Sequence, residues 1–449
     1  MANAPLVLYG VLFLITIFGP LRWSIIAFLI LSNIDNGSLN ASIGILNTAK
    51  AMVLPVYLLW RFRSYSGHER ISPVPVTWGL LILYVAIASS WSLFPAYAIK
   101  LLGHMIGSLV ICMMLMRATK AGYLNFQTVA IVSCGVIGMA LFHWRFMHDW
   151  GGETDRFTTF SGAQAFAAFL TALYCAALFA RSVKLSIRIP LSLALAASVL
   201  ANGSRLWILG LLLSTLAAVF VSEAKAWLKV VTLGASLIAL AAVTIEFDTV
   251  MDVLAQHAGS NRIAAAVTAA YEGNFKSTGL GTYNLRHELY RRTLASIAGG
   301  SSMQVIFGHG TCNGALIAAS LNKNPDPNRA MHDEFLRAAY EWGVAGLLLW
   351  LSFLIALFVY ALKGASRDRL GYAKPLLIYL PAFTLGLSGE NIIAGAGNAV
   401  SVGLLVLIAL ASISHRLAQR AAPMRARYFQ SGEMQLLPSN ALARATWAS

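Results

Sequence analysis

Long apolar runs follow one another along nearly the whole chain, separated by short stretches rich in polar residues, glycine and proline. Most runs come close to the ~20 residues that an α-helix needs to cross a bilayer. The first run is interrupted at Pro20-Leu21-Arg22, which leaves open one broken helix or a hairpin of two. We therefore predict an all-α, polytopic integral membrane protein with about 12 transmembrane helices, or one more for a hairpin. The predicted spans cover residues 5–34, 43–60, 76–94, 96–116, 128–144, 162–180, 189–202, 206–221, 228–245, 344–362, 375–387 and 394–413.

Composition supports the same class. Hydrophobic residues make up 58% of the chain and charged residues 11%, whereas a soluble domain is roughly 25% charged. The net charge of +15 raises the alternative of a nucleic-acid-binding protein, which the distribution of that charge disfavours. No charged segment followed by a small-residue cleavage site opens the chain, so we expect no cleaved signal peptide.

Basic residues concentrate in one set of the loops between predicted spans. Together with the segment after residue 415, these loops hold nineteen Lys and Arg residues but only four acidic residues. The opposite loops are close to balanced. Because cytoplasmic loops of membrane proteins carry the excess of Lys and Arg, we expect the first set and the basic tail at 416–449 to be cytoplasmic. The basic loops are 61–70, 117–120, 181–188, 222–229 and 363–374.

One connection is far longer than the others. Residues 247–341 separate an N-terminal group of spans within 1–246 from C-terminal spans within 342–415, and the charge distribution places this loop on the non-cytoplasmic side. A loop of this length in a compact protein usually serves a function, so we expect the chemistry of the protein here. Hydrophobic periodicity and turn residues predict helices at 260–271 and 283–297, with breaks at 299–302 and 322–328.

Two arginines occupy positions suited to an anion. Arg205 follows Ser204 at a junction of two predicted spans, where an arginine is costly unless it faces a cavity, pairs with another group or snorkels to the interface. Its guanidinium offers a fixed fork of donors that suits a phosphate group. Arg286 and Tyr290 lie four residues apart, so they share a helix face and could point into one site. The alternative for that segment is a basic amphipathic helix lying on the bilayer.

His332 comes at the end of the long loop, just before a predicted span. A histidine can exchange a proton near neutral pH or, when protonated, bind phosphate; the alternative is a structural residue at a helix start. Asp333 and Glu334 are typical of the first turn of a helix. Lys50 and Lys100 lie within apolar runs, so each must face a cavity or snorkel, and they are further candidates for an anion site.

The sequence lacks the marks of several other chemistries. No Walker-type glycine loop or metal-ligand cluster is visible, and Gly308-His309-Gly310 is too short for a nucleotide fingerprint. We therefore expect no cofactor and no metal. Since nucleotides are not available outside the cytoplasm, an outward-facing enzyme would need a donor that arrives activated and lipid-bound. The cysteines, interpreted as small packing residues without disulfide or zinc spacing, are Cys112, Cys134, Cys175 and Cys312.

In these motifs the chain resembles the superfamily of O-antigen ligases and Wzy-type O-antigen (exopolysaccharide) polymerases of bacterial envelopes. That family shows Ser-Arg at a periplasmic span junction, here Ser204-Arg205. It shows an Arg with an aromatic residue four positions on, usually Trp and here Tyr290 after Arg286, followed by Gly-x-Gly, here residues 308–310.

The family signature continues with His, then usually Asn, Ser or Gln, then nine residues and Gly-x-x-Gly. This chain has His332, Asp333, nine residues, Gly343 and Gly346. Asp333 departs from the usual amide or hydroxyl residue, which weakens a ligase assignment more than the family assignment. The similarity covers residues 191–362, and elsewhere extends only to topology.

The resemblance implies a metal-independent inverting glycosyltransferase of the GT-C type in the bacterial inner (cytoplasmic) membrane, with the large loop periplasmic and the C-terminus cytoplasmic. Its donor would be a glycan on undecaprenyl diphosphate, and its acceptor a second glycan or lipid A–core. Arg205 and Arg286 would bind the diphosphate and stabilise the charge on the departing lipid phosphate. His332 would orient or deprotonate the acceptor hydroxyl.

The preferred interpretation is a polymerase that joins lipid-linked repeat units of O-antigen or exopolysaccharide. A ligase that moves the finished glycan onto lipid A–core uses the same donor chemistry and is the alternative. A glycan or lipid transporter without catalysis would be expected to show internal symmetry, which is not visible. A SEDS-type peptidoglycan polymerase would not carry these loop motifs.

Overall fold

The computed structural model describes residues 4–34, 49–65, 73–146, 157–159, 162–222, 281–322, 333–367, 370–388 and 399–430. Every regular element within these ranges is a helix, which confirms the all-α class. Five described helices are long and apolar enough to cross a membrane, and the other apolar helices are shorter. The predicted span at 228–245 lies outside the described residues. The five long helices are Pro73–Trp91, Pro95–Lys120, Phe126–Arg145, Leu185–Asn202 and Gly343–Ser366.

The N-terminal part consists of nine described α-helices and three short helical turns of other types, one of them a π-helix. They are α1 (Ala4–Phe18), α2 (Leu21–Leu31), the π-helix η3 (Ala49–Val53), α4 (Leu54–Arg61), the 3₁₀ turn η4 (Arg63–Tyr65), α5 (Pro73–Ala88), the 3₁₀ turn η5 (Ser89–Trp91), α6 (Pro95–Lys120), α7 (Phe126–Phe146), α8 (Ala163–Leu178), α9 (Leu185–Asn202) and α10 (Arg205–Val221).

The second part of the described chain contains four helices before the long α18 and two after it. They are α14 (Gly281–Ala298), α15 (Ser302–Phe307), α16 (Gly314–Asn322), α17 (Glu334–Glu341), α18 (Gly343–Arg367), α19 (Lys374–Leu387) and α20 (Ala399–Gln430). The helix predicted at 283–297 is α14. The helices α15, α16 and α17 were not predicted, and the segments 260–271 and 323–328 lie outside the described residues.

The predicted first span is two helices that pack against each other, as in the hairpin alternative. The break falls at Gly19-Pro20, where proline begins a new helix because its ring fits the first turn but not a helix interior. Arg61 of α4 satisfies the carbonyl groups left open at the end of α1. Its Nη1 donates to the Ile17 oxygen at 3.1 Å and its Nη2 to the Gly19 oxygen at 3.0 Å.

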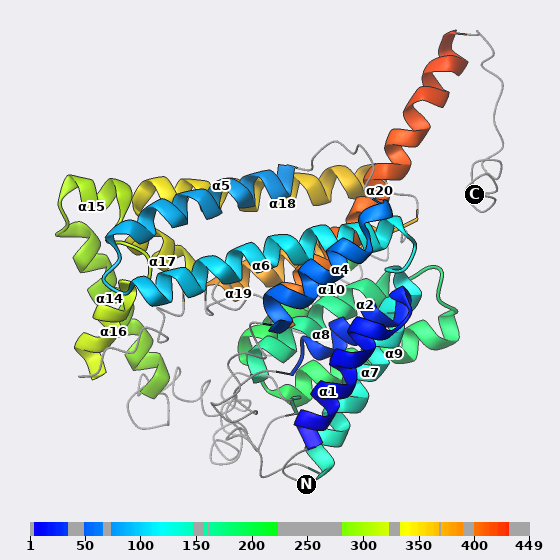
Figure 1. Ribbon diagram of the computed structural model, residues 1–449, viewed down its shortest axis with the longest axis horizontal. Helices are drawn as coiled ribbons and strands as arrows, with labels where there is room; N and C mark the ends of the chain where they lie inside the picture. The colour runs from blue at the N-terminus through cyan, green and yellow to red at the C-terminus, as the bar shows by residue number, and fades with distance from the viewer. Residues whose placement is uncertain are drawn as a thin grey trace, which may run out of the picture.

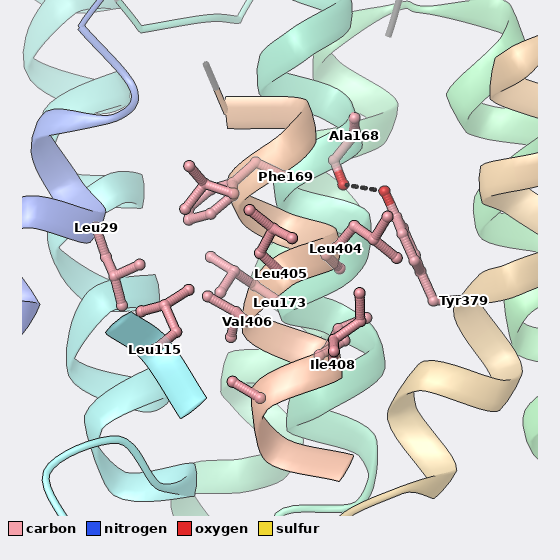
Figure 2. Packing of buried hydrophobic residues seen from close by; sticks show 14 of the residues in the cluster. Leu29, Leu115, Ala168, Phe169, Leu173, Tyr379, Leu404, Leu405, Val406 and Ile408 are labelled. Carbon is pink, nitrogen blue, oxygen red and sulfur yellow. Dashed lines mark hydrogen bonds between the residues drawn. The ribbon is translucent and has the colours of Figure 1, made fainter. Parts of the chain in front are cut away.

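The core of the bundle is apolar and closely packed around α8 and α20 (Figure 2). A Cβ at Gly403 of α20 would lie 3.0 Å from the Ala172 Cβ and 3.2 Å from a Phe169 ring carbon, so glycine and alanine bring these two helices together. Small residues at such contacts are typical of helices that pack within membranes. On the other side of α8, the Tyr379 hydroxyl of α19 donates to the Ala168 carbonyl at 3.5 Å.

The long helices α5, α6 and α18 run side by side, and α14, α15, α16 and α17 gather at one end of them (Figure 1). We call this the α14–α17 end. At the opposite end Arg117 of α6 donates to the Leu59 carbonyl of α4 at 3.2 Å. Arg416 of α20 donates to Thr119 there at 3.0 Å. Residues of the predicted cytoplasmic set therefore meet at the end away from α14–α17.

The directions of three packed helices place α10 relative to that end. The start of α19 lies at the end of α8, because Lys374 sits 5.8 Å from the Phe179 ring centre. The Tyr174 hydroxyl of α8 is 3.0 Å from Thr215 of α10, and residues near the start of α8 contact the end of α9 through Phe157. Consequently α8 and α10 run in the same direction and α19 runs against both. α10 therefore begins, at Arg205, where α19 ends.

Candidate functional site

The two glycine motifs of the long loop lie backbone against backbone. The His309 and Gly310 N–H groups donate to the Tyr340 and Glu341 carbonyls, both at 2.9 Å. A Cβ at Gly308 would stand 2.2 Å from the Glu341 oxygen. Only glycine leaves room for this approach. Residues 308–310 are therefore not a nucleotide-binding loop but the partner of the segment that follows α17.

The second motif supplies the other half of the same contact. Gly343 adopts a φ of +64°, and a Cβ there would lie 2.4 Å from the Ile306 carbonyl oxygen. Gly346, one turn into α18, makes room for the ring of Tyr84, whose Cε1 would be 2.9 Å from its Cβ. The Tyr84 hydroxyl donates to the Trp342 carbonyl at 2.9 Å. Both glycines of the Gly-x-x-Gly motif thus serve close packing between segments far apart in sequence.

The turn after residue 310 is bound to the connection between α5 and α6. The Ser92 hydroxyl donates to the Thr311 carbonyl at 2.5 Å, and the Leu93 N–H donates to the Asn313 side-chain oxygen at 2.9 Å. The Asn313 amide nitrogen donates in turn to the His309 carbonyl. Cys312 holds a left-handed φ of +66° within this turn. These bonds hold the loop against two helices of spanning length.

Asp333 caps α17. One of its carboxylate oxygens accepts the N–H groups of Phe335 and Leu336, both at 2.9 Å. Burial raises the pKa of this carboxyl, and the two backbone donors oppose that shift. Asn and Ser are good helix caps for the same reason as Asp. Asp333 therefore fills the capping role that an Asn or Ser residue could also fill at this position.

A buried cluster of charges lies on one face of α17, and we call Glu334, Arg337 and Glu341 the α17 charge cluster. All three side chains are buried. Arg337 Nη1 is 3.4 Å from a Glu334 oxygen, and Arg337 Nε is 3.7 Å from a Glu341 oxygen. The guanidinium also sits 5.5 Å from the ring centre of Trp342, which is within range of a cation–π interaction. Glu334 is thus more than the ordinary first-turn residue that the sequence suggests.

The formal charges of the α17 charge cluster do not cancel. Two carboxylates face one guanidinium, and neither ion-pair contact has hydrogen-bond geometry. Burial raises the pKa of Glu341, although Arg337 and the N–H groups of Cys312 and Gly314 lower it. Acid, base and acid at positions i, i+3 and i+7 fall on one helix face. That spacing is a signal in the sequence from which the cluster could have been predicted.

His309 packs against the C-terminal part of α17. Its ring stacks on Tyr340 with centroids 4.2 Å apart and planes at 11°. Its Nδ1 lies 3.2 Å from the Tyr340 carbonyl oxygen. Burial raises the pKa of the Tyr340 hydroxyl. His309 therefore has a packing role between the two glycine motifs.

The predicted helix with Arg286 and Tyr290 reaches the bundle through its tyrosine. The Tyr290 hydroxyl donates to the Ser388 carbonyl, just after α19, at 3.4 Å. The backbone of Arg286 lies one turn earlier in α14, and its side chain is outside the described part. Arg291 is exposed and bonds Glu288 at 2.8 Å. Arg291 is therefore a solvated residue paired with its helix neighbour.

Arg205 is the first residue of α10 and follows a tight turn. Gly203 takes the left-handed conformation, φ +69°, that ends α9. The side-chain nitrogen of Asn202 donates to the Phe157 carbonyl at 2.9 Å, which holds the turn to the segment 157–159. The side chain of Arg205 is outside the described part. Since α10 begins where α19 ends, its first residue and Tyr290 lie at the same end of the bundle.

Lys50 is buried at 2% exposure in the π-helix η3. Its ammonium donates to the Ile34 carbonyl at 2.6 Å. The neighbouring Asn33 carbonyl accepts the Thr159 hydroxyl at 3.0 Å, and the adjacent segment reaches Asn202 as described above. Hydrogen bonds therefore lead from Lys50 to the turn before Arg205, a link that sequence reasoning missed. Single-turn π segments occur frequently at functional sites.

The remaining candidates from the sequence are Lys100, His332, the possible metal ligands and the cysteines. Lys100 is exposed near the start of α6, and no contact with another candidate residue is recorded for it in the described ranges. His332 lies outside the described residues, directly before the Asp333 cap. Where side chains are described, no group of three His, Cys, Asp or Glu residues could hold a metal ion. The four cysteines are free; Cys112 and Cys175 are buried, whereas Cys134 is exposed on α7.

Comparison with known proteins adds no name to this site. Neither the models of known protein families nor the curated protein sequences match the chain.

Proposed function

We propose that the protein is a glycosyltransferase of the bacterial inner membrane that takes its glycan from undecaprenyl diphosphate on the periplasmic side. In this proposal it polymerises repeat units of O-antigen or exopolysaccharide. The observation that carries the proposal is the contact between the two glycine motifs. Residues 308–310 and 340–343 are parts of the motifs by which the chain resembles that superfamily, and their backbones are hydrogen-bonded to each other. A resemblance resting on chance spacing would not require the motifs to meet.

Sidedness is consistent with this assignment. Arg117 and Arg416, two basic residues of the predicted cytoplasmic set, make their contacts at the end of the bundle opposite α14–α17. Cytoplasmic ends of membrane proteins are enriched in Lys and Arg. The long loop would then face the periplasm, where a lipid-linked donor is the available activated sugar.

The chemistry proposed is a single displacement at the anomeric carbon of the donor. The acceptor hydroxyl oxygen forms the new bond, the bond from that carbon to the diphosphate oxygen breaks, and the diphosphate leaves with the electron pair. His332 would take the hydroxyl proton. Arg205 and Arg286 would stabilise the charge that grows on the departing diphosphate. Lys50 lies within the same end of the bundle and would add positive potential there.

A ligase with lipid A–core as acceptor remains the second candidate, because it shares this donor chemistry. The capping role of Asp333 favours neither of the two, since Asn, Ser and Asp cap helices about equally well. The acceptor decides between them. Incubation with donor alone should yield a ladder of longer lipid-linked glycans if the protein is a polymerase. Transfer that requires added lipid A–core would identify a ligase.

The enzymatic proposal is tested by release of undecaprenyl diphosphate from an undecaprenyl-diphosphate-linked oligosaccharide in the presence of the purified full chain. Arg286→Ala and His332→Ala should each reduce release at least about 100-fold, a loss typical of removing a charge-stabilising or proton-transferring group. Arg291→Ala is the matched control, because this exposed arginine lies on the same helix α14. The control should leave release unchanged. No release by the unmodified protein, or equal release from all three variants, would contradict the proposal.

A further inference from the structure

The short helix α15 exposes large apolar side chains although it belongs to a connection between spans. Met303 is 67% exposed, Ile306 46% and Phe307 41%. The helix contains no charged residue, and its start is closed by a capping box between Ser301 and Gln304. Exposed polar residues on the same helix are Ser302 and Gln304. A group of exposed large apolar side chains of this kind is typical of a contact with lipid or with another protein.

This surface continues the exposed apolar faces of two helices of spanning length. α15 packs against α18, whose first turns expose Val344 and Leu348. On α5, Leu83 and Ile87 are exposed. Tyr84 of the same helix also contacts α15, because its hydroxyl donates to the Phe307 carbonyl at 3.2 Å. Figure 1 shows α15 at the end of both helices. Where α5 and α18 face acyl chains, the same environment extends onto α15.

Trp91 indicates the depth in the membrane at which α15 and the turn after it lie. Trp91 ends the 3₁₀ turn after α5 and is partly exposed. Its carbonyl oxygen would lie 2.7 Å from a Cβ at Gly310, so Trp91 and the turn at 308–313 are in direct contact. Tryptophan is enriched at membrane–water interfaces, where its ring sits at the level of the headgroups. The turn that follows α15 therefore lies at that level.

We propose that α15 is an interfacial helix, with Met303, Ile306 and Phe307 inserted among the acyl chains of the leaflet at the α14–α17 end. The partner is the lipid bilayer. Because α15 carries no charged residue and continues the exposed apolar sides of α5 and α18, lipid is favoured over a second protein surface as its partner. Burying such an apolar face in the interface is how monotopic helices hold their depth.

One consequence concerns the substrate, and it rests on the proposed function. With α15 in the leaflet, residues 308–310 stand at the depth of the lipid headgroups. A diphosphate carried on a polyprenyl chain would reach the protein at that same depth, by lateral movement within the leaflet. The depth of α15 itself does not depend on catalysis.

Nitroxide spin labels measure that depth directly. A label at Met303→Cys is introduced into the full chain carrying Cys134→Ser, which removes the exposed cysteine and leaves the buried Cys112 and Cys175 in place. The protein is reconstituted in vesicles of phosphatidylethanolamine and phosphatidylglycerol. Collision rates with oxygen, which concentrates in the acyl region, are compared with those of a water-soluble nickel chelate. The protein with Cys134→Ser alone, without an introduced cysteine, is the control. Any nitroxide signal that it gives comes from Cys312 and is subtracted from the signals of the labelled variants.

Two further sites calibrate the scale. Ile355→Cys, on the exposed face in the middle of α18, represents the acyl region, and Arg291→Cys, on the exposed face of α14, represents water. The label at 303 should resemble the label at 355 in its preference for oxygen, at a shallower depth. Phe307→Cys should give the same result if Met303→Cys fails to fold.

Nickel accessibility at 303 and 307 equal to that at 291 would overturn the proposal. So would dipolar broadening at 303 that disappears on dilution with unlabelled protein, because it would identify a second copy as the partner. A failure of donor turnover leaves these outcomes unaffected. The failure of this inference is therefore distinguishable from failure of the proposed function.

Discussion

Two cations are equally buried in this protein, and their surroundings differ completely. Lys50 and Arg337 are each 2% exposed. Lys50 lies in a π-helix within the bundle, and its recorded hydrogen bond goes to the backbone carbonyl of Ile34. Arg337 lies on α17, at the α14–α17 end, between the carboxylates of Glu334 and Glu341.

The two sets of contacts show which parts of the protein each cation stabilises. Lys50 lies in a series of hydrogen bonds that joins the end of α2 to the segment 157–159 and to Asn202 at the end of α9. Arg337 compensates charges on its own helix, and Glu341 of that helix accepts the Gly314 N–H at 3.3 Å. Loss of Lys50 would leave a polar group unpaired, whereas loss of Arg337 would leave two buried carboxylates. The predictions below separate these cases.

The largest effect is expected for Arg337→Met. Removing one partner of a buried ion pair costs about 3–5 kcal/mol, because the two buried carboxylates lose the cation that compensates their charge. Thermal unfolding of the purified protein in detergent measures the loss. The triple variant Glu334→Gln, Arg337→Met, Glu341→Gln should be more stable than the single variant, since it leaves no uncompensated charge. A triple variant as unstable as Arg337→Met would refute the electrostatic explanation.

Gly308→Ala should cost about 3 kcal/mol. Its φ of +86° and ψ of +174° belong to a region open essentially to glycine, and the new Cβ would overlap the Glu341 carbonyl. Gly122→Ala is the matched control, because its φ of +78° is also positive and a Cβ there meets nothing within 4 Å. The control should cost only about 1–2 kcal/mol, the strain of the left-handed conformation. Equal losses in thermal unfolding would show that close backbone packing at 308 is unimportant.

Lys50→Met should cost about 1–3 kcal/mol, less than Arg337→Met. Methionine retains most of the length of lysine but leaves the buried Ile34 carbonyl without this donor. Lys100→Met, at an exposed position of α6, is the control and should change the unfolding temperature little. A loss for Lys50→Met that exceeds that of Arg337→Met would reverse the comparison between the two cations.

Asp333→Ala should cost about 0.5–2 kcal/mol through loss of the cap on α17, whereas Asp333→Asn should be nearly neutral. Both variants are compared with the unmodified protein by thermal unfolding at neutral pH. If Asn fails to substitute for Asp, the carboxylate has a role beyond accepting the N–H groups of Phe335 and Leu336.

The smallest effect concerns pH and the exposed pair on α14. Side-chain hydrogen bonds from Arg291 and Arg292 lower the pKa of Glu288 to about 2. A carboxyl with a lowered folded-state pKa contributes stability above its unfolded value of roughly 4.3, and that contribution is lost as the pH falls toward the folded-state value. Because the pair is exposed, the contribution is small. Glu288→Gln should therefore lower the unfolding temperature slightly at pH 7 and not at all near pH 2.

Arg291→Gln sharpens that test. It removes one of the two donors, so the pH at which the contribution of Glu288 disappears should rise. An unchanged profile would assign the stabilisation of Glu288 to Arg292 alone, which also bonds the Ser320 carbonyl of α16 at 3.1 Å.

The all-helical class and the approximate positions of most described helices were predictable, because they depend on features that act along the chain. Apolar runs at 128–144, 206–221 and 344–362 correspond to α7, α10 and α18, and the periodicity at 283–297 corresponds to α14. Each of these elements satisfies its own backbone hydrogen bonds, so local composition and periodicity suffice to locate it. The break at Gly19-Pro20 was predictable for the same reason, since proline cannot continue a helix.

The contacts that build the candidate site were decided only in three dimensions. Gly308 meets Glu341 and Gly343, Tyr84 reaches the Phe307 and Trp342 carbonyls, and the Lys50 ammonium finds the carbonyl of Ile34. The burial of the α17 charge cluster also depends on these neighbours. No periodic pattern encodes such contacts, because they join residues 16 to 258 positions apart in the sequence. Their energy depends on which surfaces the packed helices bring together. The sequence by itself determined which segments are helical and which residues carry charge. The tertiary structure decided which of those charges are buried, what compensates them, and which glycines allow two backbones to touch.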